Sequence, residues 1–166
     1  KILFDVPGIK PRTSNSKIIK IKKGEIVIFS FKKKLKNKNK LQIELTNPLP
    51  KINKNCKTFT LSDGQYTFSL LSYNKHYVIG KSKNSFELLP KKGLNIPYSE
   101  YSDKEQKKIY LKFLKKTKKI KYDAIGLSFI QSEKILKELK KTYPKIALVA
   151  KIENYKAINN LDNICK

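Results

Sequence analysis

The strongest constraint on the fold of this chain is a pair of short, almost continuous apolar runs that flank an amphipathic stretch. The runs are residues 124–130 and residues 146–152. Short runs without alternation are typical of parallel strands that are covered on both faces. After Ser132, the stretch between them places apolar residues at helical spacing, namely Ile135, Leu136, Leu139 and Tyr143. The sequence therefore predicts a strand–helix–strand unit, which is right-handed in nearly all proteins.

Two further segments extend this α/β pattern. Residues 2–4 form an apolar run that ends at Asp5 and is followed by Pro7 and Gly8, which predicts a buried parallel strand and a turn. Ser102 precedes a lysine-rich stretch with scattered apolar residues, which predicts a capped helix. Three strands are too few to close a (β/α)8 barrel, so the α/β body in this chain is incomplete.

The residues between these segments follow a different pattern, in which apolar and polar side chains alternate. Alternation with frequent turn signals predicts an all-β unit of about six to eight short strands, arranged as a small barrel or sandwich. Lys23-Gly24 and Asp63-Gly64 each lie between alternating stretches and indicate hairpins. The lysine- and asparagine-rich run at residues 32–40 predicts a solvated loop.

The change of pattern divides the chain into three segments. Residues 1–11 carry the first strand of the α/β body, residues 12–95 form the inserted β unit, and residues 96–166 resume the α/β body. We therefore predict an α/β protein that is interrupted by a β module.

The charge of the chain is strongly positive, because 38 basic and 13 acidic residues give a formal net charge of +25. Every basic residue except Arg12 is a lysine, whereas nucleic-acid-binding proteins usually combine both, since arginine contacts phosphate and guanine bidentately. The excess is therefore more typical of compositional drift, although it predicts salt-dependent, non-specific binding of polyanions. No apolar run reaches the roughly 18 residues that a membrane-spanning helix needs.

The cysteines indicate the redox state of the compartment, and the lack of methionine concerns whether the sequence is a whole translation product. Cys56 and Cys165 stand far apart and in no metal-type spacing, which excludes a disulfide framework and predicts a reducing, cytoplasmic compartment. The sequence contains no methionine, so we expect a processed product or an excerpt of something longer.

Polar side chains mark the carboxyl ends of the predicted parallel strands, where α/β proteins carry their chemistry. Asp5 follows the first run and Ser128 lies within the second. Lys151 and Glu153 end the third run, and residues two apart on a strand point the same way. This pair would either hold an anionic substrate and a divalent metal side by side or form a plain ion pair.

The β unit offers fewer candidates. Arg12 follows a turn and is either a surface residue or a functional cation. The segment Lys91-Lys92-Gly93 is either a solvated turn or a phosphate-contacting loop. His76 lies in a polar loop and is not expected to be catalytic, and the sequence holds neither a Ser–His–Asp set nor a glycine-rich phosphate-binding fingerprint.

Several segments resemble the pyruvate kinase family, in that family's order. Residues 4–13 (FDVPGIKPRT) resemble the segment that ends the third barrel strand and opens the lid domain, and residues 61–64 (LSDG) resemble a hairpin of that lid. Residues 89–97 (LPKKGLNIP) resemble the segment that leaves the lid. Residues 127–132 (LSFIQS) and 150–154 (AKIEN) resemble the next two barrel strands, and the last of these motifs is the most specific.

This resemblance implies a partial (β/α)8 TIM barrel with an inserted all-β barrel, the lid. It implies a glycolytic enzyme, usually a homotetramer, that transfers a phosphoryl group from phosphoenolpyruvate to ADP and releases pyruvate and ATP. Positioning and cationic clamps account for most of the catalysis in such transfers.

The resemblance also implies roles for single residues. Lys151 corresponds to the lysine that stabilises the phosphoryl group in transit and the enolate, and Glu153 to a carboxylate ligand of the essential Mg²⁺. Asp5 corresponds to a ligand of a monovalent cation, to which Val6 could offer only its carbonyl. Two residues correspond to contacts with the nucleotide phosphates, Arg12 and Lys92.

The chain departs from the family pattern in ways that matter for function. Lys10 stands where potassium-dependent members have glutamate and potassium-independent members have lysine, which predicts that K⁺ is dispensable. Val6-Pro7 replaces the Thr-Lys of many members. The family's substrate-binding segment before Asp5 and its second magnesium carboxylate after Cys165 are absent from this sequence, so we do not expect the 166 residues to catalyse the reaction alone.

Two alternative hypotheses stay open. A diverged, non-catalytic basic protein that binds RNA or another polyanion would use an exposed aromatic surface, for which the candidates are Tyr66, Phe68, Tyr73 and Tyr77. A β module that serves as a regulatory domain predicts that residues 12–95 fold alone whereas residues 96–166 do not.

Overall fold

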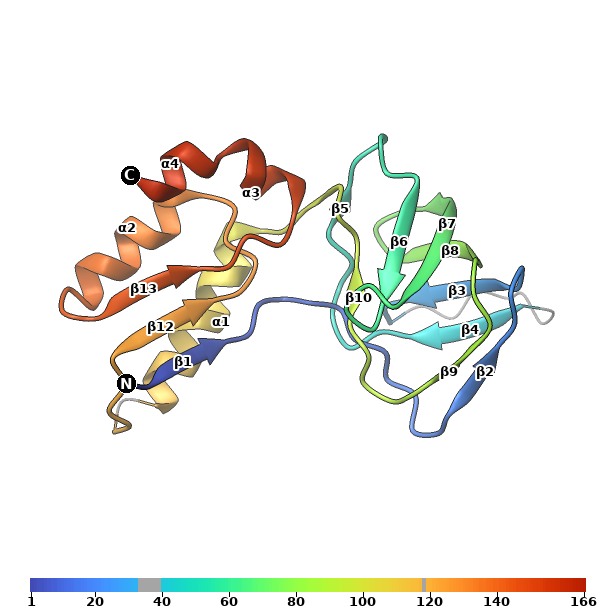
Figure 1. The fold of residues 1–166 in the computed structure, drawn as a ribbon, viewed down its shortest axis with the longest axis horizontal. Coiled ribbons are helices and arrows are strands. Elements are labelled where there is room, and N and C mark those ends of the chain that lie inside the picture. Colours follow the sequence, from blue (N-terminus) through green and yellow to red (C-terminus); the bar gives the residue numbers. More distant parts are fainter. Residues whose placement is uncertain (33–39, 118) are drawn as a thin grey trace. The chain divides into compact units, whose positions relative to one another are not determined.

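The structure, a computed structural model, describes residues 1–32, 40–117 and 119–166. The chain forms two compact units (Figure 1). We call Lys1–Ile9 with Glu100–Lys166 the α/β unit and Lys10–Ser99 the β unit. The run predicted as a solvated loop, residues 32–40, lies outside the described residues except for its first and last members.

Three parallel strands form the sheet of the α/β unit, in the order β1 (Leu3–Val6), β12 (Ala124–Leu127) and β13 (Ala147–Ala150). All three runs were predicted as buried parallel strands. Their parallel pairing is confirmed, but most residues of β1 and β13 are exposed or only partly buried. The carboxyl ends of the strands lie level, because Val6 is in register with Leu127, and Leu127 with Ala150.

The strands differ in their limits from the apolar runs that predicted them. Asp5 lies inside β1 rather than after it, whereas Ser128 follows β12 and Lys151 follows β13. Strand pairing, and not apolar character, sets these ends: the last paired residues are Leu127 and Ala150. Lys151 and Glu153 both follow β13, so the alternation of side chains along a strand does not set their directions.

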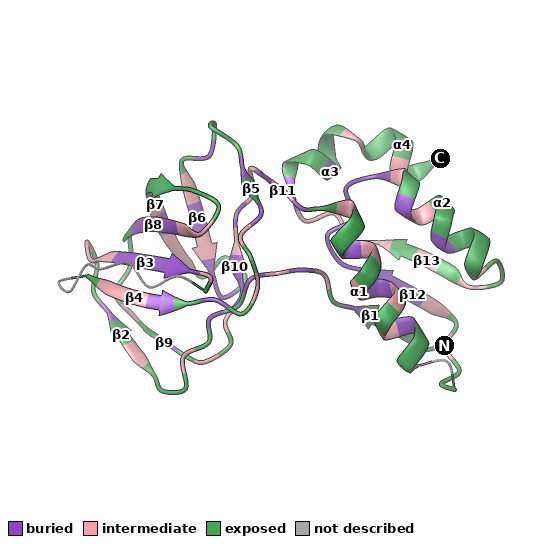
Figure 2. Cartoon of the chain, turned by 180° about the vertical axis from the view of Figure 1, so that it is seen from behind, coloured by how far each residue is buried: buried purple, intermediate pink, exposed green. Residues whose placement is uncertain are grey.

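Helices cover one face of this sheet (Figure 2). As predicted, α1 (Asp103–Lys116) begins at Ser102 and α2 (Glu133–Thr142) begins at Ser132, and each serine hydroxyl accepts a backbone N–H of the first turn. The core between sheet and helices consists of the buried side chains Val6, Tyr110, Leu114, Ile125, Leu127, Ile130, Ile135 and Leu139. Two short helices, α3 (Tyr155–Asn159) and α4 (Leu161–Cys165), end the unit.

The opposite face of the sheet is not covered by the described residues. Side chains alternate along a strand, so Leu3 and Val149 project away from the helices and are 55% and 44% exposed. Parallel sheets are normally covered on both faces. The α/β unit therefore presents half of its sheet to its surroundings.

The β unit is built on one six-stranded sheet and two small ladders. The order in the large sheet is β10 (Leu94–Asn95), β6 (Thr58–Leu61), β7 (Tyr66–Tyr73), β8 (Tyr77–Ser82), β3 (Ile26–Ser30) and β4 (Leu41–Glu44). The ladders pair β2 (Ile19–Ile21) with β9 (Phe86–Leu88), and β5 (Lys51–Ile52) with β11 (Ser99–Glu100). Within the described residues the large sheet ends at β10 and β4, so the all-β barrel that the resemblance implies is not confirmed.

The core of the β unit is aromatic and tightly packed. Phe59 stacks on Phe68 with ring centroids 5.1 Å apart, and Phe29 meets both rings edge-on. All three side chains are fully buried. A glycine is required beside them, because a Cβ on Gly80 would lie 2.5 Å from the Phe59 ring.

One of the two predicted hairpins is confirmed. At Asp63-Gly64, β6 and β7 pair in antiparallel register, and the turn carries positive φ angles of 53°, 54° and 97° at Ser62, Asp63 and Gly64. The hairpin predicted at Lys23-Gly24 is wrong.

The chain does turn at Lys23-Gly24, with a φ of 87° at Gly24, but β2 and β3 pair with other strands. The reason is that this turn is bound to the end of β8. The N–H of Gly24 donates to the Ser82 carbonyl, and the N–H of Ser82 donates to the Glu25 carbonyl. Alternation in the sequence predicted the strands but not their partners.

Candidate active site

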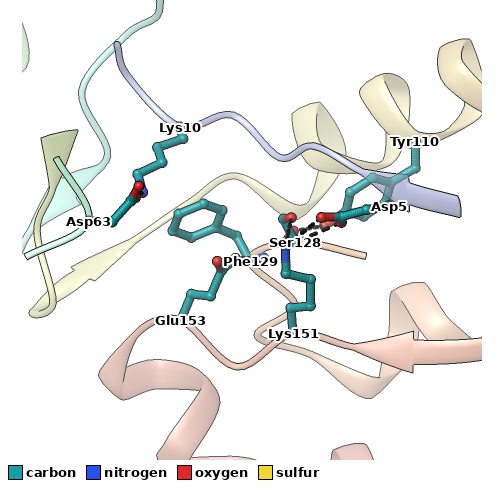
Figure 3. A network of polar contacts seen from close by, with 8 residues as sticks. All are labelled: Asp5, Lys10, Asp63, Tyr110, Ser128, Phe129, Lys151 and Glu153. Carbon is teal, nitrogen blue, oxygen red and sulfur yellow. Dashed lines mark hydrogen bonds and ion pairs between the residues drawn. The ribbon is translucent and has the colours of Figure 1, made fainter. Parts of the chain in front are cut away.

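Lys151 is held at the carboxyl edge of the parallel sheet by residues that belong to or follow the other two strands (Figure 3). Its ammonium donates to both carboxylate oxygens of Asp5, at 3.0 and 3.2 Å, and to the hydroxyl of Ser128 at 3.0 Å. Its backbone N–H donates to the Leu127 carbonyl at 3.0 Å. The parallel register therefore brings Asp5, Ser128 and Lys151, three residues that the sequence placed near strand ends, into contact and fixes a positive charge there.

Glu153 is oriented by the backbone and not by Lys151. Its Oε2 accepts the N–H of Phe129 at 2.8 Å. Phe129 has a φ of 61°, a left-handed conformation that a bulky side chain rarely adopts. Its ring is buried against Tyr101 and Ile9, which stabilises this conformation. The alternative of a plain Lys151–Glu153 ion pair is therefore wrong, since the two side chains have different partners.

A buried polar cluster beneath these residues was not predicted from the sequence. Gln106 of α1 is fully buried; its Oε1 accepts the N–H of Ile9 at 2.6 Å, and its Nε2 donates to the Tyr110 hydroxyl at 2.9 Å and the Ser128 carbonyl at 3.0 Å. The Tyr110 hydroxyl also donates to the Ser128 carbonyl. The cluster thus anchors the Ser128–Phe129 peptide, whose N–H binds Glu153.

The available signal for this cluster was the spacing of Gln106 and Tyr110. Residues four apart lie on one face of a helix, and a glutamine next to a tyrosine on a core-facing stripe indicates a buried hydrogen bond. Burial, followed by the negative charges of Glu153 and Asp103, raises the pKa of Tyr110. Tyr110 therefore stays neutral and keeps the proton that it donates to Ser128.

Gly8 allows the chain to approach this cluster closely. A Cβ on Gly8 would lie 2.8 Å from Gln106 Nε2, 2.9 Å from the Phe129 ring and 3.0 Å from the Ser128 carbonyl oxygen. Real Cβ contacts are longer than this, so no side chain fits here without displacing the cluster.

Arg12 and Lys92 lie on adjacent segments of the β unit. Arg12 pairs with Gly93 in an isolated antiparallel bridge, and its guanidinium donates to the Lys91 carbonyl at 3.2 Å. Thr13 and Lys92 exchange two hydrogen bonds, from Thr13 N–H to the Lys92 carbonyl and from Lys92 N–H to the Thr13 hydroxyl. The structure therefore brings the two predicted phosphate contacts together within this unit.

Comparison with known proteins agrees with these motifs. The family model "Pyruvate kinase, barrel domain" matches residues 1–166. The chain belongs to the pyruvate kinase family. Its relatives include the curated pyruvate kinases of Thermotoga maritima and Thermococcus litoralis, each 28% identical, and that of Mycoplasma genitalium, 27% identical.

The matches to these relatives include nearly all of this chain, 99%, 98% and 99% respectively. They include only 36%, 35% and 35% of the relatives. The chain therefore spans about a third of the length of the curated pyruvate kinases that it matches.

A metal ion in this pyruvate kinase homologue would be bound by single carboxylates and not by a cluster of ligands. No three His, Cys, Asp or Glu side chains among the described residues form a group that could hold a metal ion. Mg²⁺ is commonly held by one or two carboxylates with water and substrate phosphates, so Glu153 fits as one such ligand. Asp5 is engaged by Lys151, and the Val6 carbonyl accepts the N–H of Ser128 at 3.2 Å. Their roles toward a monovalent cation stay predictions.

The aromatic residues proposed for nucleic-acid binding do not form one exposed surface. Phe68 is fully buried in the core, and Tyr66 stacks on Phe86 with ring centroids 3.8 Å apart. Of the four candidates, Tyr73 is the exposed one. The structure therefore gives no support to a stacking platform in this pyruvate kinase homologue.

Two predictions from the sequence concern the environment of the pyruvate kinase homologue. No helix of the described residues has the length and apolar character needed to cross a membrane. Cys56 is buried, which raises the pKa of its thiol, and Cys165 is exposed; both are free. A cytoplasmic location stays a prediction.

Proposed function

We propose that this chain takes part in the pyruvate kinase reaction, the transfer of a phosphoryl group from phosphoenolpyruvate to ADP with release of pyruvate and ATP. The observation that carries the proposal is the Lys151 ammonium, which Asp5 and Ser128 hold at the carboxyl edge of the parallel sheet. Family membership and the names of the relatives support the same reaction.

We further infer that the three parallel strands are part of a (β/α)8 barrel and that the β unit is its lid. The uncovered face of the sheet supports this inference, because a barrel interior would cover Leu3 and Val149. The level carboxyl ends of β1, β12 and β13 would then lie at the mouth of the barrel, where the chemistry of such folds is located.

In this mechanism Lys151 stabilises the negative charge on the phosphoryl oxygens and on the enolate oxygen. Asp5 and Ser128 fix the direction of its ammonium before substrate binds, so little reorganisation is needed during the reaction. Glu153 would hold Mg²⁺, which neutralises phosphoryl charge when bound. The Phe129 N–H leaves one carboxylate oxygen of Glu153 for that ligand.

The nucleotide would be held by the β unit. Arg12 and Lys92 would contact the ADP phosphates as fixed cations. A monovalent cation would lie at Asp5 and the Val6 carbonyl, unless Lys10 makes it dispensable. An activity assay of the complete gene product with Na⁺ in place of K⁺ tests this point: an unchanged rate supports a dispensable K⁺, and strong activation by K⁺ contradicts it.

The test of the proposed function is an activity assay of the complete gene product with Lys151→Met. Since removal of one electrostatic contact to a transition state typically costs about 10²–10³ in kcat, we expect a loss of at least that size. The matched control is Lys145→Met, which removes the charge of an exposed lysine just before β13. An unchanged kcat in Lys151→Met would refute the proposed role.

A further inference from the structure

Three cations of the β unit gather where the chain enters and leaves it. The entering segment lies antiparallel to the leaving segment, with Arg12 opposite Gly93. The Thr13 N–H donates to the Lys92 carbonyl at 2.9 Å, and the Leu94 N–H donates to the Pro11 carbonyl at 2.8 Å. These bonds fix the backbone that carries Lys10, Arg12 and Lys92.

Lys10 lies flat on Gly93 and points at Asp63. A Cβ on Gly93 would lie 2.6 Å from the Lys10 Cε, so the glycine makes room for this side chain. The Lys10 side chain is only 16% exposed, and its ammonium contacts the Asp63 carboxylate at 2.8 Å (Figure 3). The lysine is therefore held in one place by packing as well as by its charge.

Asp63 is placed differently from its partner. Its side chain is 87% exposed at the tip of the β6–β7 turn, and its φ of 54° is left-handed. The turn is anchored to the leaving segment, because the Ser62 N–H donates to the Gly93 carbonyl at 3.1 Å. An exposed carboxylate of this kind is surrounded by water and can leave its partner at little cost.

The surroundings of Asp63 are strongly positive. The hydrogen bond and charge of Lys10, and then the charges of Arg12 and Lys92, lower the pKa of this carboxyl group. Lys10 contacts Asp63 directly, and Arg12 and Lys92 lie near enough for their charges to act on it, so another anion at this position would meet the same three charges. Two of them are the residues proposed to contact nucleotide phosphates.

We propose that Asp63 is an internal competitor for phosphate: its carboxylate occupies Lys10 until a polyphosphate displaces it and takes Lys10 as a third cation beside Arg12 and Lys92. The proposal rests on the proposed function, which assigns Arg12 and Lys92 to nucleotide phosphates. A polyphosphate is favoured in the exchange because it carries more charge and more acceptor oxygens than one carboxylate. Asp63 would thus lower the affinity of the β unit for nucleotide.

The experiment titrates ATP and, separately, inorganic tripolyphosphate into the 166-residue chain at low ionic strength. Because an exposed ion pair is worth up to about 1 kcal/mol, we expect Asp63→Asn to lower the Kd of both ligands about two- to fivefold. Asparagine tolerates left-handed backbone, so the turn is preserved. If Asp63→Asn lowers the Kd of ATP but not that of tripolyphosphate, the proposal is overturned, since recognition would not then depend on the phosphates.

Two control variants isolate the effect. Glu87→Gln breaks another exposed pair of the β unit, Lys20–Glu87 at 3.7 Å, and changes the net charge equally. It should leave both Kd values unchanged, and an equal gain there would show a general charge effect and overturn the proposal. In a chain that already carries Lys10→Gln, Asp63→Asn should not lower either Kd, because the cation for which Asp63 and phosphate compete is absent.

A fourth variant separates this proposal from the function on which it rests. If Arg12→Ala weakens ATP binding while Asp63→Asn has no effect, the phosphate site stands and the competitor is refuted. If Arg12→Ala leaves the Kd for ATP unchanged both in the wild-type chain and in Asp63→Asn, the phosphate site and the competitor are both refuted. Both are refuted as well if neither chain binds ATP. Circular dichroism of each variant confirms that the β unit is folded.

Discussion

The two units of this chain solve the burial of a sheet in different ways. The β unit covers its sheet with its own residues, and the rings of Phe29, Phe59 and Phe68 are completely buried in its core. The α/β unit covers one face of its sheet with α1 and α2 and leaves Leu3 and Val149 on the other face exposed. Parallel sheets are normally covered by another layer on both faces. Antiparallel strands can be joined by short turns, so one segment of chain can bury the apolar face of its own sheet.

The difference also separates two kinds of functional residue. Lys151, Asp5 and Glu153 belong to the unit with the uncovered sheet and lie near the carboxyl edge of that sheet. Arg12 and Lys92 belong to the unit with the complete core and are fixed by backbone pairing. We infer that the residues proposed to bind phosphate are preorganised by local structure, whereas the residues proposed for catalysis depend on the segments that complete the sheet.

The largest expected effect is on independent folding. An excised fragment of residues 10–99 should unfold in one cooperative urea transition, because it retains its whole core. A fragment of residues 100–166 keeps α1 and α2 on one face of its two strands, but it lacks β1 and leaves the other face uncovered. It should therefore bind a hydrophobic dye and show no cooperative transition. Circular dichroism and dye fluorescence measure both properties.

Similar behaviour of the two fragments would contradict this difference between the units. A dye-binding, non-cooperative 10–99 fragment would mean that the β unit depends on the rest of the chain. A cooperative 100–166 fragment would mean that an uncovered parallel sheet is stable here, contrary to the argument from burial.

The second expected effect is a difference in the free energy of unfolding between two glycine-to-alanine substitutions, one in each unit. Gly80→Ala places a Cβ 2.5 Å from the Phe59 ring, and such overpacking costs about 1–3 kcal/mol. Gly126→Ala places its Cβ 3.5 Å from the Asp5 carboxylate, an ordinary contact, and should change stability by less than about 1 kcal/mol.

Urea denaturation of the full chain measures both values. Each variant is the control for the other, because both replace a strand glycine by alanine. A larger loss for Gly126→Ala than for Gly80→Ala would contradict the view that the β unit has the tighter core.

The smallest effect is the dependence of stability on pH, to which Tyr110 of the α/β unit and Asp63 of the β unit contribute at opposite ends of the pH range. The pKa of Tyr110 is raised, so the α/β unit loses stability as pH rises above the ordinary tyrosine value of about 10, where the unfolded chain ionises first. The pKa of Asp63 is lowered, so its contribution exists above the ordinary aspartate value of about 3.9 and is lost as pH falls through the folded value.

Urea unfolding at a series of pH values measures the loss of stability on the acid side and on the alkaline side, which we call the acid and alkaline limbs. Tyr110→Phe should flatten the alkaline limb and Asp63→Asn the acid limb. Burial also raises the pKa of Cys56 in the β unit, so Cys56→Ser serves as the control on the alkaline side. An alkaline limb that Tyr110→Phe leaves unchanged would contradict a neutral, buried Tyr110.

Local features of the fold were predictable from the sequence because they depend on neighbouring residues. The capping serines Ser102 and Ser132 and the turn at Asp63-Gly64 are local hydrogen-bonding and backbone effects, and all three were confirmed. The partners of β2 and β3 were not predictable. They follow from contacts of the Lys23-Gly24 turn with β8, which is distant in the sequence.

The candidate site shows the same division. Residue types and motifs were enough to select Asp5, Ser128, Lys151 and Glu153, because parallel strands end at one edge. Whether Lys151 pairs with Glu153 or with Asp5 was not decided by spacing, since β13 ends before both residues. The buried Gln106 was missed, because its spacing from Tyr110 places the two on one face of the helix but does not show that this face is buried.

From the sequence alone we could identify the three parallel strands, the two helices capped by serine and the family that the motifs resemble. These properties follow from periodicity, turn chemistry and residue identity. Tertiary structure alone decided the partners of each charge: Lys151 with Asp5, Glu153 with the Phe129 N–H, and Lys10 with Asp63. Such pairs join residues far apart in the chain, and their geometry exists only after the strands have aligned and the core has closed.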